Sequence, residues 1–203
     1  MKSLLYAIIC TGLFAFVIFA NPVEGREKRA GQSKDAGSGR GKAEKPKIKI
    51  EELEKKVHEY INRERKKKGL SALGWNEKLN RIARRYSRNM SERGFFSHND
   101  PDGKCFTDRY KAGGFECRVR FGDKTCLGAE NIAQENLYKS VSIRNGDPSY
   151  DWNSVDEIAA SVVKLWMKSK GHRENILTPY FKCQGIGIAI SKEGRVFVTE
   201  NFC

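Results

Sequence analysis

Residues 184–202 read QGIGIAISKEGRVFVTENF, and this stretch decides the fold class. The segments 184–190 and 195–202 are each typical of a strand, and the turn at 191–194 joins them into a hairpin at the end of the chain. Helical periodicity precedes the hairpin without any alternation of strands and helices. The sequence therefore predicts an α+β fold rather than a doubly wound parallel sheet.

Three amphipathic helices are predicted upstream of the hairpin. In the first, apolar residues recur at three- and four-residue steps over 48–61, and the basic run and glycine at 65–69 are typical of a helix end. We expect Asn76 to cap a second helix that Gly94 ends. The third helix is predicted over roughly 155–170. The stretch between the second and third helices is rich in Gly, Asp and Pro, so we expect it to consist largely of loops.

The N-terminus has the pattern of a secretory signal. One basic residue precedes an uncharged, mostly apolar run over 4–20, and a helix-breaking Asn-Pro follows it. We expect a signal peptide over 1–20, with cleavage after Ala20 or as late as Gly25, and therefore a secreted protein. The alternative is an uncleaved segment that anchors the protein in a membrane, because the run is near the length that spans a bilayer.

Charge is divided between a tail and a domain. The 203 residues include 38 Lys and Arg against 25 Asp and Glu, a net charge of +13. Residues 21–47 have almost no large apolar side chains and are predicted to be a flexible basic linker to a domain at 48–203. No nucleic-acid-binding motif accompanies the charge, so we expect no nucleic-acid partner. Contact between the basic tail and an anionic polymer or lipid remains open.

Loss of the signal would remove Cys10 and leave five cysteines, which suggests two disulfides and one spare thiol in a secreted chain. Cys183 and Cys203 are equidistant from the centre of the terminal hairpin, so we expect them to face each other and form one bridge. The pairing within the remaining set stays open: Cys105, Cys117 and Cys126.

Side chains suited to chemistry are few. His98 begins a turn, His172 follows the third predicted helix, and Glu130 lies among small and apolar neighbours. Two imidazoles and a carboxylate can hold zinc or another divalent metal, or orient a general base, or simply join loops through hydrogen bonds. Ser169, three positions before His172, is a candidate nucleophile. His58, inside the first helix, is expected to be an ordinary surface residue.

Five ordered segments give residues 48–203 a resemblance to the secreted CAP superfamily (cysteine-rich secretory protein, antigen 5 and pathogenesis-related), of the prokaryotic type. Together they extend over the whole predicted domain, which makes the resemblance specific. The segments are INRER at 61–65 with Gly69, Leu70 and Leu73, FSHNDPDG at 96–103, GAENIA at 128–133, WMKSKGHRENIL at 166–177, and GIG at 185–187.

The resemblance implies a three-layer α-β-α sandwich with a central antiparallel sheet, and a surface cleft where two histidines and acidic residues meet. His98, Glu130 and His172 match three of the family's four cleft positions, whereas Ser169 stands where many eukaryotic members have Glu. Without that acid and without a nucleophile motif, we expect a non-catalytic binding role towards a small hydrophobic ligand, a peptide or a protein partner. The alternatives are a metal-dependent or His/Glu hydrolase, and an envelope protein that binds anionic polymer or lipid.

Overall fold

A four-stranded sheet forms the centre of the computed structural model, which describes residues 44–203. The strand order is β1-β7-β8-β4, where β1 is Gly74–Trp75, β4 is Ala129–Asn136, β7 is Cys183–Ile190 and β8 is Arg195–Phe202. Neighbours β7, β8 and β4 are antiparallel, and β1 runs parallel to β7. The α+β prediction is confirmed, although the short β1 makes the sheet mixed rather than wholly antiparallel.

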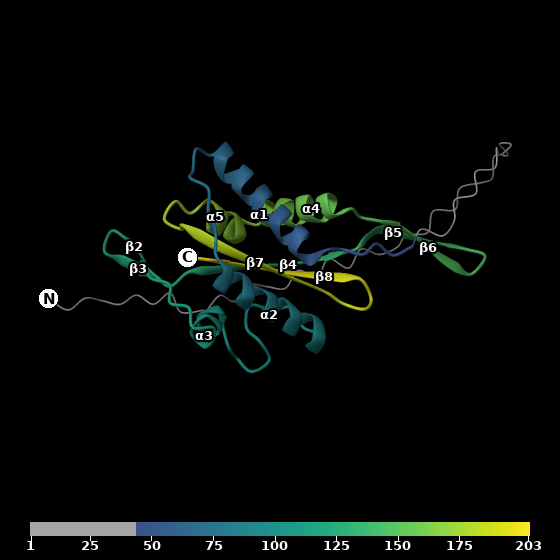
Figure 1. Ribbon diagram of the computed structural model, residues 1–203, viewed down its shortest axis with the longest axis horizontal. Helices are drawn as coiled ribbons and strands as arrows, with labels where there is room; N and C mark the ends of the chain where they lie inside the picture. Colours follow the sequence, from purple (N-terminus) through teal and green to yellow (C-terminus); the bar gives the residue numbers. More distant parts are fainter. Residues whose placement is uncertain (1–43) are drawn as a thin grey trace.

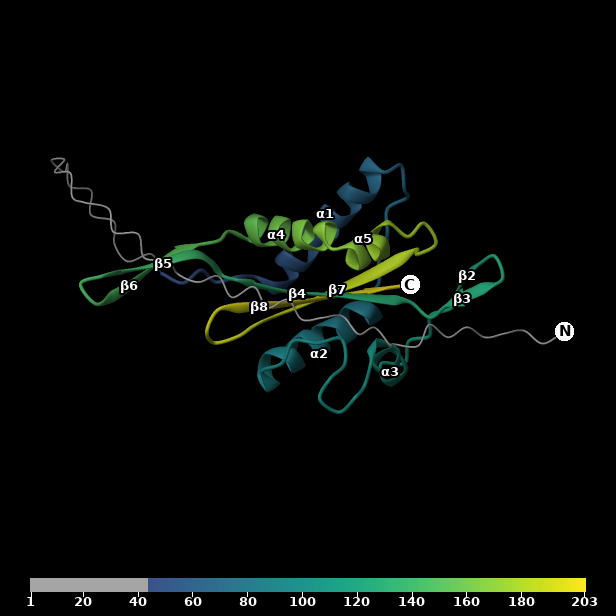
Figure 2. The same cartoon turned by 180° about the vertical axis from the view of Figure 1, so that it is seen from behind.

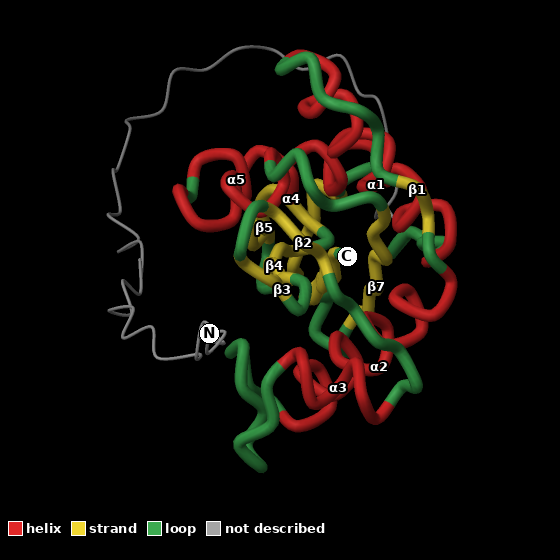
Figure 3. Tube along the Cα trace, turned by 90° about the vertical axis from the view of Figure 1, so that its left-hand side faces the viewer, coloured by secondary structure: helices red, strands yellow, loops and turns green. Residues whose placement is uncertain are grey.

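Helices cover both faces of this sheet, as Figures 1 and 2 show, and Figure 3 shows the same layers from the end. One face carries α1 (Ile50–Lys67), α4 (Val155–Lys168) and α5 (Lys170–Leu177). The other carries α2 (Glu77–Arg93) and α3 (Phe106–Ala112). The largest apolar core lies between the sheet and the first group of helices. This arrangement is the three-layer sandwich that the sequence predicts.

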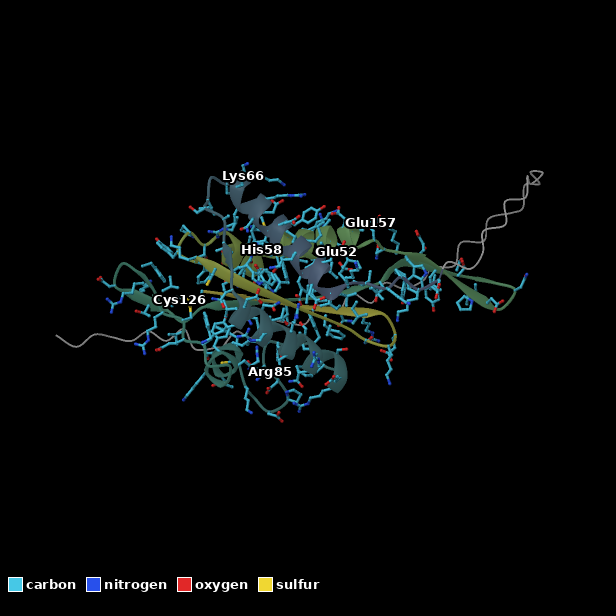
Figure 4. The ribbon with its side chains drawn as sticks, in the orientation of Figure 1. Glu52, His58, Lys66, Arg85, Cys126 and Glu157 are labelled. Atoms are coloured by element: carbon cyan, nitrogen blue, oxygen red, sulfur yellow. A yellow bond between two sulfur atoms is a disulfide. The ribbon has the colours of Figure 1, made fainter. Side chains whose placement is uncertain are left out.

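Helix ends follow local chemistry. The Asn76 side chain accepts hydrogen bonds from the amides of Lys78 and Leu79, and Gly94 ends α2 in the left-handed conformation at φ 68°. Arg85, labelled in Figure 4, lies on the exposed side of this helix. The predicted third helix is instead two helices, because the chain leaves the helical conformation at Ser169, where ψ is 127°.

Two glycines let α2 lie directly against β7. A Cβ atom at Gly185 would collide with the main chain of Asn80, and one at Gly187 would collide with that of Arg84. The close approach also brings Ser87 Oγ within 2.8 Å of the Gly187 carbonyl oxygen, to which it donates. Glycine is thus needed at both positions because a helix backbone occupies the space of a side chain.

Side chains cover the free edge of β4. Trp166 Nε1 donates to the Ile132 carbonyl at 2.9 Å, and Asn175 Nδ2 lies 3.5 Å from the Glu130 carbonyl. Main-chain groups that another strand would need are therefore already paired. The same contacts fix the start of β4 against α4 and α5.

The stretch between α2 and α4 contains more regular structure than predicted. Besides α3 and β4 it forms two hairpins: β2 (Val119–Phe121) with β3 (Lys124–Cys126), and β5 (Tyr138–Arg144) with β6 (Asp147–Trp152). The β5–β6 turn is Asn145-Gly146, with φ of 53° and 84°. Asn-Gly between strands is a strong hairpin signal, so the expectation of mere loops here was wrong for a reason visible in the sequence.

The disulfide joins Cys117 to Cys203, with the Cα atoms 5.6 Å apart. Cys183 does face Cys203, since each amide donates to the other's carbonyl, at 2.8 and 2.9 Å. The predicted Cys183–Cys203 bridge is nevertheless wrong. The loop before β2 places Cys117 beside Cys203, and these two sulfur atoms form the bond. The other described cysteines are free thiols: Cys105, Cys126 and Cys183.

Several N-terminal predictions lie outside the described residues. These are the signal peptide at 1–20, its cleavage as late as residue 25, the alternative membrane anchor, and most of the linker at 21–47. The last linker residues are described, and Lys45 Nζ donates to the Lys192 carbonyl at 3.2 Å. Within residues 44–203, no helix combines the length and apolar character needed to cross a bilayer.

Candidate functional site

Three side chains from distant parts of the sequence meet beside the first residues of β4. His98 comes from the loop after α2, Glu130 from β4, and His172 from α5. The two imidazole rings lie 6.1 Å apart between centroids, and His98 Nδ1 lies 3.0 Å from Glu130 Oε1. The structure thus brings together the three residues that the resemblance assigns to a cleft.

Glu130 is the buried end of this cluster. Its side chain is 1% exposed, and its second oxygen accepts a hydrogen bond from Arg109 Nη2 at 2.7 Å. Both carboxylate oxygens are therefore engaged, one by His98 and one by Arg109. A buried charge of this kind is stable only when it is paired and hydrogen-bonded.

Arg109, on α3, is a site residue that the sequence reasoning missed. Its guanidinium carbon lies 3.4 Å from the centroid of the Tyr86 ring, and its nitrogens also donate to the carbonyls of Lys104 and His98. These contacts hold the guanidinium and the His98 loop in one position. A single arginine in a stretch without periodicity carries no sequence signal that distinguishes it from a surface residue.

His98 presents one defined face to solvent. An ionised carboxylate only accepts hydrogen bonds, so the His98 nitrogen that contacts Glu130 must be the protonated one. Nδ1 therefore carries the hydrogen, which in the neutral ring leaves Nε2 as the nitrogen that can accept a hydrogen bond. The side chain is half exposed, so a ligand can reach it.

His172 is held through its main chain. Its carbonyl accepts from Asn131 Nδ2 at 3.2 Å, and Asn131 Oδ1 in turn accepts from Asn175 Nδ2 at 2.9 Å. Burial, followed by the charge of His98, lowers the pKa of His172 to about 4. The imidazole of His172 is consequently neutral at physiological pH.

A second buried carboxyl lies behind the cleft. Glu200, on β8, is fully buried, and its Oε2 accepts from Asn131 Nδ2 at 3.0 Å. Burial raises the pKa of Glu200 well above its usual range, although Asn131 and the Arg65 charge oppose the shift. Glu200 therefore keeps its proton, and Asn131 links it to the His172 carbonyl.

Ser169 does not have the contacts of an activated nucleophile. It is exposed at the junction of α4 and α5, where its carbonyl accepts from the Arg173 amide at 3.0 Å. Among the hydrogen bonds of the described residues, none joins its hydroxyl to His172. Its nucleophile role stays a prediction without a supporting contact.

A metal ion held by His98, His172 and Glu130 would require all three side chains to converge. No three His, Cys, Asp or Glu side chains within 44–203 converge so that they could hold a metal ion. Glu130, the expected third ligand beside His98 and His172, has both oxygens engaged by other residues. The arrangement therefore does not fit a three-ligand zinc site, and Glu130 acts as a carboxylate that orients His98.

His58 differs from expectation. It is half-buried, its ring nitrogens contact the side-chain amides of Asn62 and Gln184, and its ring meets the edge of Trp75 at 5.4 Å between centroids. Figure 4 labels it on α1, with Lys66 towards the end of the same helix. The prediction of an ordinary surface residue is wrong, since His58 joins α1 to β1 and β7.

A separate groove of about 310 Å³ runs between α1 and α4. Apolar side chains of both helices line it, among them Tyr60, Val163 and Met167. Lys164 and Lys168 add positive charge to the same groove. Glu64 also lines the groove, which thus combines an apolar surface with two cations and one carboxylate.

Comparisons with known proteins agree with this geometry. The profile of the cysteine-rich secretory protein family, CAP, matches residues 58–202. The uncharacterized protein YkwD of Bacillus subtilis is 32% identical over 138 residues, which are 68% of this chain and 43% of YkwD.

Two solved structures are similar in fold. An extracellular protein of Bacillus anthracis that contains an SCP domain has 25% identity and a TM-score of 0.51, over 75% of this chain and 40% of that one. An outer surface protein of Borrelia burgdorferi has 18% identity and a TM-score of 0.55, over 78% of this chain and 97% of that one. This chain spans less than half the length of YkwD and of the B. anthracis protein.

Proposed function

Because the chain belongs to the cysteine-rich secretory protein (CAP) family, we propose that it is an extracellular binding protein whose His98–His172 cleft recognises a peptide or a segment of a partner protein. The single observation that carries the proposal is the engagement of Glu130. With one oxygen on His98 and the other on Arg109, this buried carboxylate holds the residues of the cleft in position.

The electrostatics of His172 support the same proposal. An efficient general base has a pKa near the operating pH, whereas the pKa of His172 is lowered to about 4. Its neutral ring suits hydrogen bonding and stacking against a ligand better than proton transfer at pH 7. The alternative of a His/Glu hydrolase would require either Glu130 or His172 to be released from these constraints.

Extracellular placement is also part of the proposal. The predicted signal peptide, the disulfide between Cys117 and Cys203, and the description of the B. anthracis relative as extracellular all support it. Non-reducing mass spectrometry of protein from the culture medium of a native or related host would test this placement. Recovery of the chain only from the cytoplasm, with all thiols reduced, would contradict it.

A random peptide library incubated with the immobilised protein tests the cleft. We expect peptides to be retained intact, and a His98→Ala/His172→Ala variant to lose that retention, while Cys105→Ser serves as a folded control. Peptide fragments that form with the native protein and disappear with Glu130→Gln/His172→Asn would establish the hydrolase alternative instead. A zinc titration of the native protein and of the His98→Ala/His172→Ala variant tests the metal alternative. Equal, weak zinc binding by both proteins would contradict that alternative.

The groove between α1 and α4 is a second candidate site, for the small hydrophobic ligand that the resemblance suggests. Its apolar lining and its two lysines suit a small amphiphile with an anionic head. Displacement of a fluorescent fatty-acid probe measures such binding. We expect Ala160→Phe, which fills the groove, to weaken the probe's binding, and Ser169→Ala to leave it unchanged.

A further inference from the structure

We propose that the β5–β6 hairpin is a membrane-docking element whose apolar face inserts into a bilayer surface that carries anionic lipids. The inference concerns a surface separate from the cleft and does not depend on the peptide-binding proposal. It extends the alternative that the chain is an envelope protein that binds anionic polymer or lipid, because it names the part of the fold that would contact the lipid.

The hairpin has one apolar face. The cross-strand pairs Val141–Tyr150 and Ile143–Pro148 lie on the same side, because side chains alternate along a strand. The aromatic rings continue this side, with Tyr138 5.2 Å from Tyr150 and Tyr150 4.7 Å from Trp152 between centroids. The opposite face is polar: Ser140, Ser142, Ser149 and Asp151.

Most of the apolar face is not covered by the domain, and of its described side chains only Trp152, at the base of the hairpin, packs against the main core. In Figures 1 and 2 the hairpin extends beyond the layered helices and sheet, and among the described elements its strands pack extensively only on each other. Ile143 is 76% exposed and Val141 48% exposed. An isolated two-stranded hairpin gains little stability in water, so an apolar face of this kind points to an external surface that covers it.

The order of side chains along the hairpin suits a lipid interface. Ile143 and Pro148 lie next to the turn, Val141 and the half-buried ring of Tyr150 form the middle pair, and the half-buried rings of Tyr138 and Trp152 lie nearest the domain. Tyr and Trp favour the level of lipid headgroups, while aliphatic side chains favour the acyl region. The hairpin therefore presents its groups in the order that a bilayer surface would meet them.

Positive charge arrives at the same end of the molecule. The sequence 26–49 has nine basic and three acidic residues, a net charge of +6. Lys45 donates to Lys192 in the β7–β8 turn, and Gly194 of that turn accepts from the Leu137 amide, next to β5. The described end of this segment, which carries Lys45, Lys47 and Lys49, thus enters the domain near the base of the hairpin, where its lysines favour anionic headgroups.

Carboxylates also lie at this end of the molecule, among them Asp151 and Glu157, and Glu157 is paired with Lys139 of β5 at 2.7 Å. A protein partner or a second copy fits less well, because six side chains on a narrow ribbon are far fewer than the roughly 20–30 residues that a stable interface takes from each partner.

Sedimentation with vesicles of phosphatidylcholine and phosphatidylglycerol tests the proposal on protein recovered from the medium of a secreting host. We expect Val141→Ser/Ile143→Ser to lower the bound fraction about tenfold at low salt, and Leu165→Ser, an exposed apolar residue of α4, to leave it unchanged. Salt should weaken the native binding. Equal binding by the native protein and the hairpin variant would overturn the proposal.

Fluorescence gives a second test that does not depend on how the rest of the chain binds. In the full chain, whose native Trp152 also lies on the hairpin, we expect brominated lipids to quench the emission that Ile143→Trp adds to that of the native protein, and not the emission that Leu165→Trp adds. Absence of quenching at position 143 would overturn the proposal. So would a dimer that Val141→Ser/Ile143→Ser dissociates in the absence of lipid, because the hairpin would then be covered by a second copy.

Discussion

Glu130 and Arg109 form a buried ion pair, so removal of either residue alone leaves the other charge without its partner. The guanidinium also donates a hydrogen bond to the His98 carbonyl and so holds the His98 loop in position. The ion pair therefore contributes to stability and to the shape of the cleft at the same time.

We expect Arg109→Leu to lower the free energy of unfolding by about 3–5 kcal/mol, because it strands a buried carboxylate. Arg109→Leu/Glu130→Gln should recover part of that loss, since the double variant buries no charge. Urea denaturation of the native protein, Arg109→Leu, Glu130→Gln and the double variant measures the coupling free energy between the two residues. Additive effects of the two substitutions would show that the pair does not interact.

Glu200 gives the molecule a pH dependence of known sign. Its pKa in the folded state is raised, so the folded state keeps a proton that the unfolded state loses as the pH rises above about 4.5. The contribution of this group to stability is therefore complete at acidic pH and falls as the pH rises towards the folded pKa.

Glu200→Gln should remove this loss, because a glutamine does not titrate and its oxygen can still accept from Asn131. We expect the variant to melt at a higher temperature than the native protein at pH 7.5 and at a similar temperature at pH 4. A variant that is less stable at pH 7.5 would mean that Glu200 is ionised and paired with Arg65.

At the level of secondary-structure elements, the contact between α2 and β7 leaves the least room for a larger side chain. We expect Gly187→Ala to cost about 3 kcal/mol or more, because the new methyl group would meet the main chain of Ala83 and Arg84. Gly171→Ala is the matched control: it lies in α5 with open space around it, so it should be neutral or stabilising. Thermal melts of both variants would test this, and equal costs would contradict the close packing.

The sequence predicted the elements whose signals are local. Asn76, Gly94 and the terminal hairpin each carry a turn or cap signal, and each was confirmed. Strand β4 was missed because both of its faces are buried, so that polar and apolar residues do not alternate along it. Asn145-Gly146 carried a hairpin signal that the prediction of loops over this stretch did not use.

The candidate site likewise contains residues that could be predicted from the sequence and residues that could not. His98, Glu130 and His172 were found by resemblance to family motifs, whereas spacing alone gave no reason for them to meet. Arg109 was missed because its role depends on the tertiary placement of α3. The burial of His58 likewise arises from β1 and β7, which pack against α1 from distant parts of the sequence.

At the level of the whole molecule, the disulfide ties the C-terminus to the loop before β2 and closes a loop with a sequence separation of 86. We expect Cys117→Ser to lower the free energy of unfolding by about 2–4 kcal/mol, because it frees the unfolded chain from this closure. Cys183→Ser, at the position opposite Cys203, should cost less than about 1 kcal/mol. The reverse order of costs would indicate a Cys183–Cys203 bridge.

All three layers of the molecule help to position the cleft, and the proposed function is that it binds a ligand rather than transfers protons. His172 reports on this proposal directly, because its pKa of about 4 keeps the ring neutral across the physiological range. A general acid–base centre would instead titrate within that range.

The most direct measurement is long-range ¹H–¹⁵N NMR of the three histidines during a pH titration. We predict that His98 stays protonated on Nδ1 beside Glu130, and that His172 stays neutral until the pH falls to about 4. Because the unfolded His172 would take up its proton near pH 6.5, stability should also decline between pH 6.5 and 4. A His172 that titrates near 6.5, together with a His98 that exchanges between tautomers, would contradict a fixed binding cleft and favour a catalytic one.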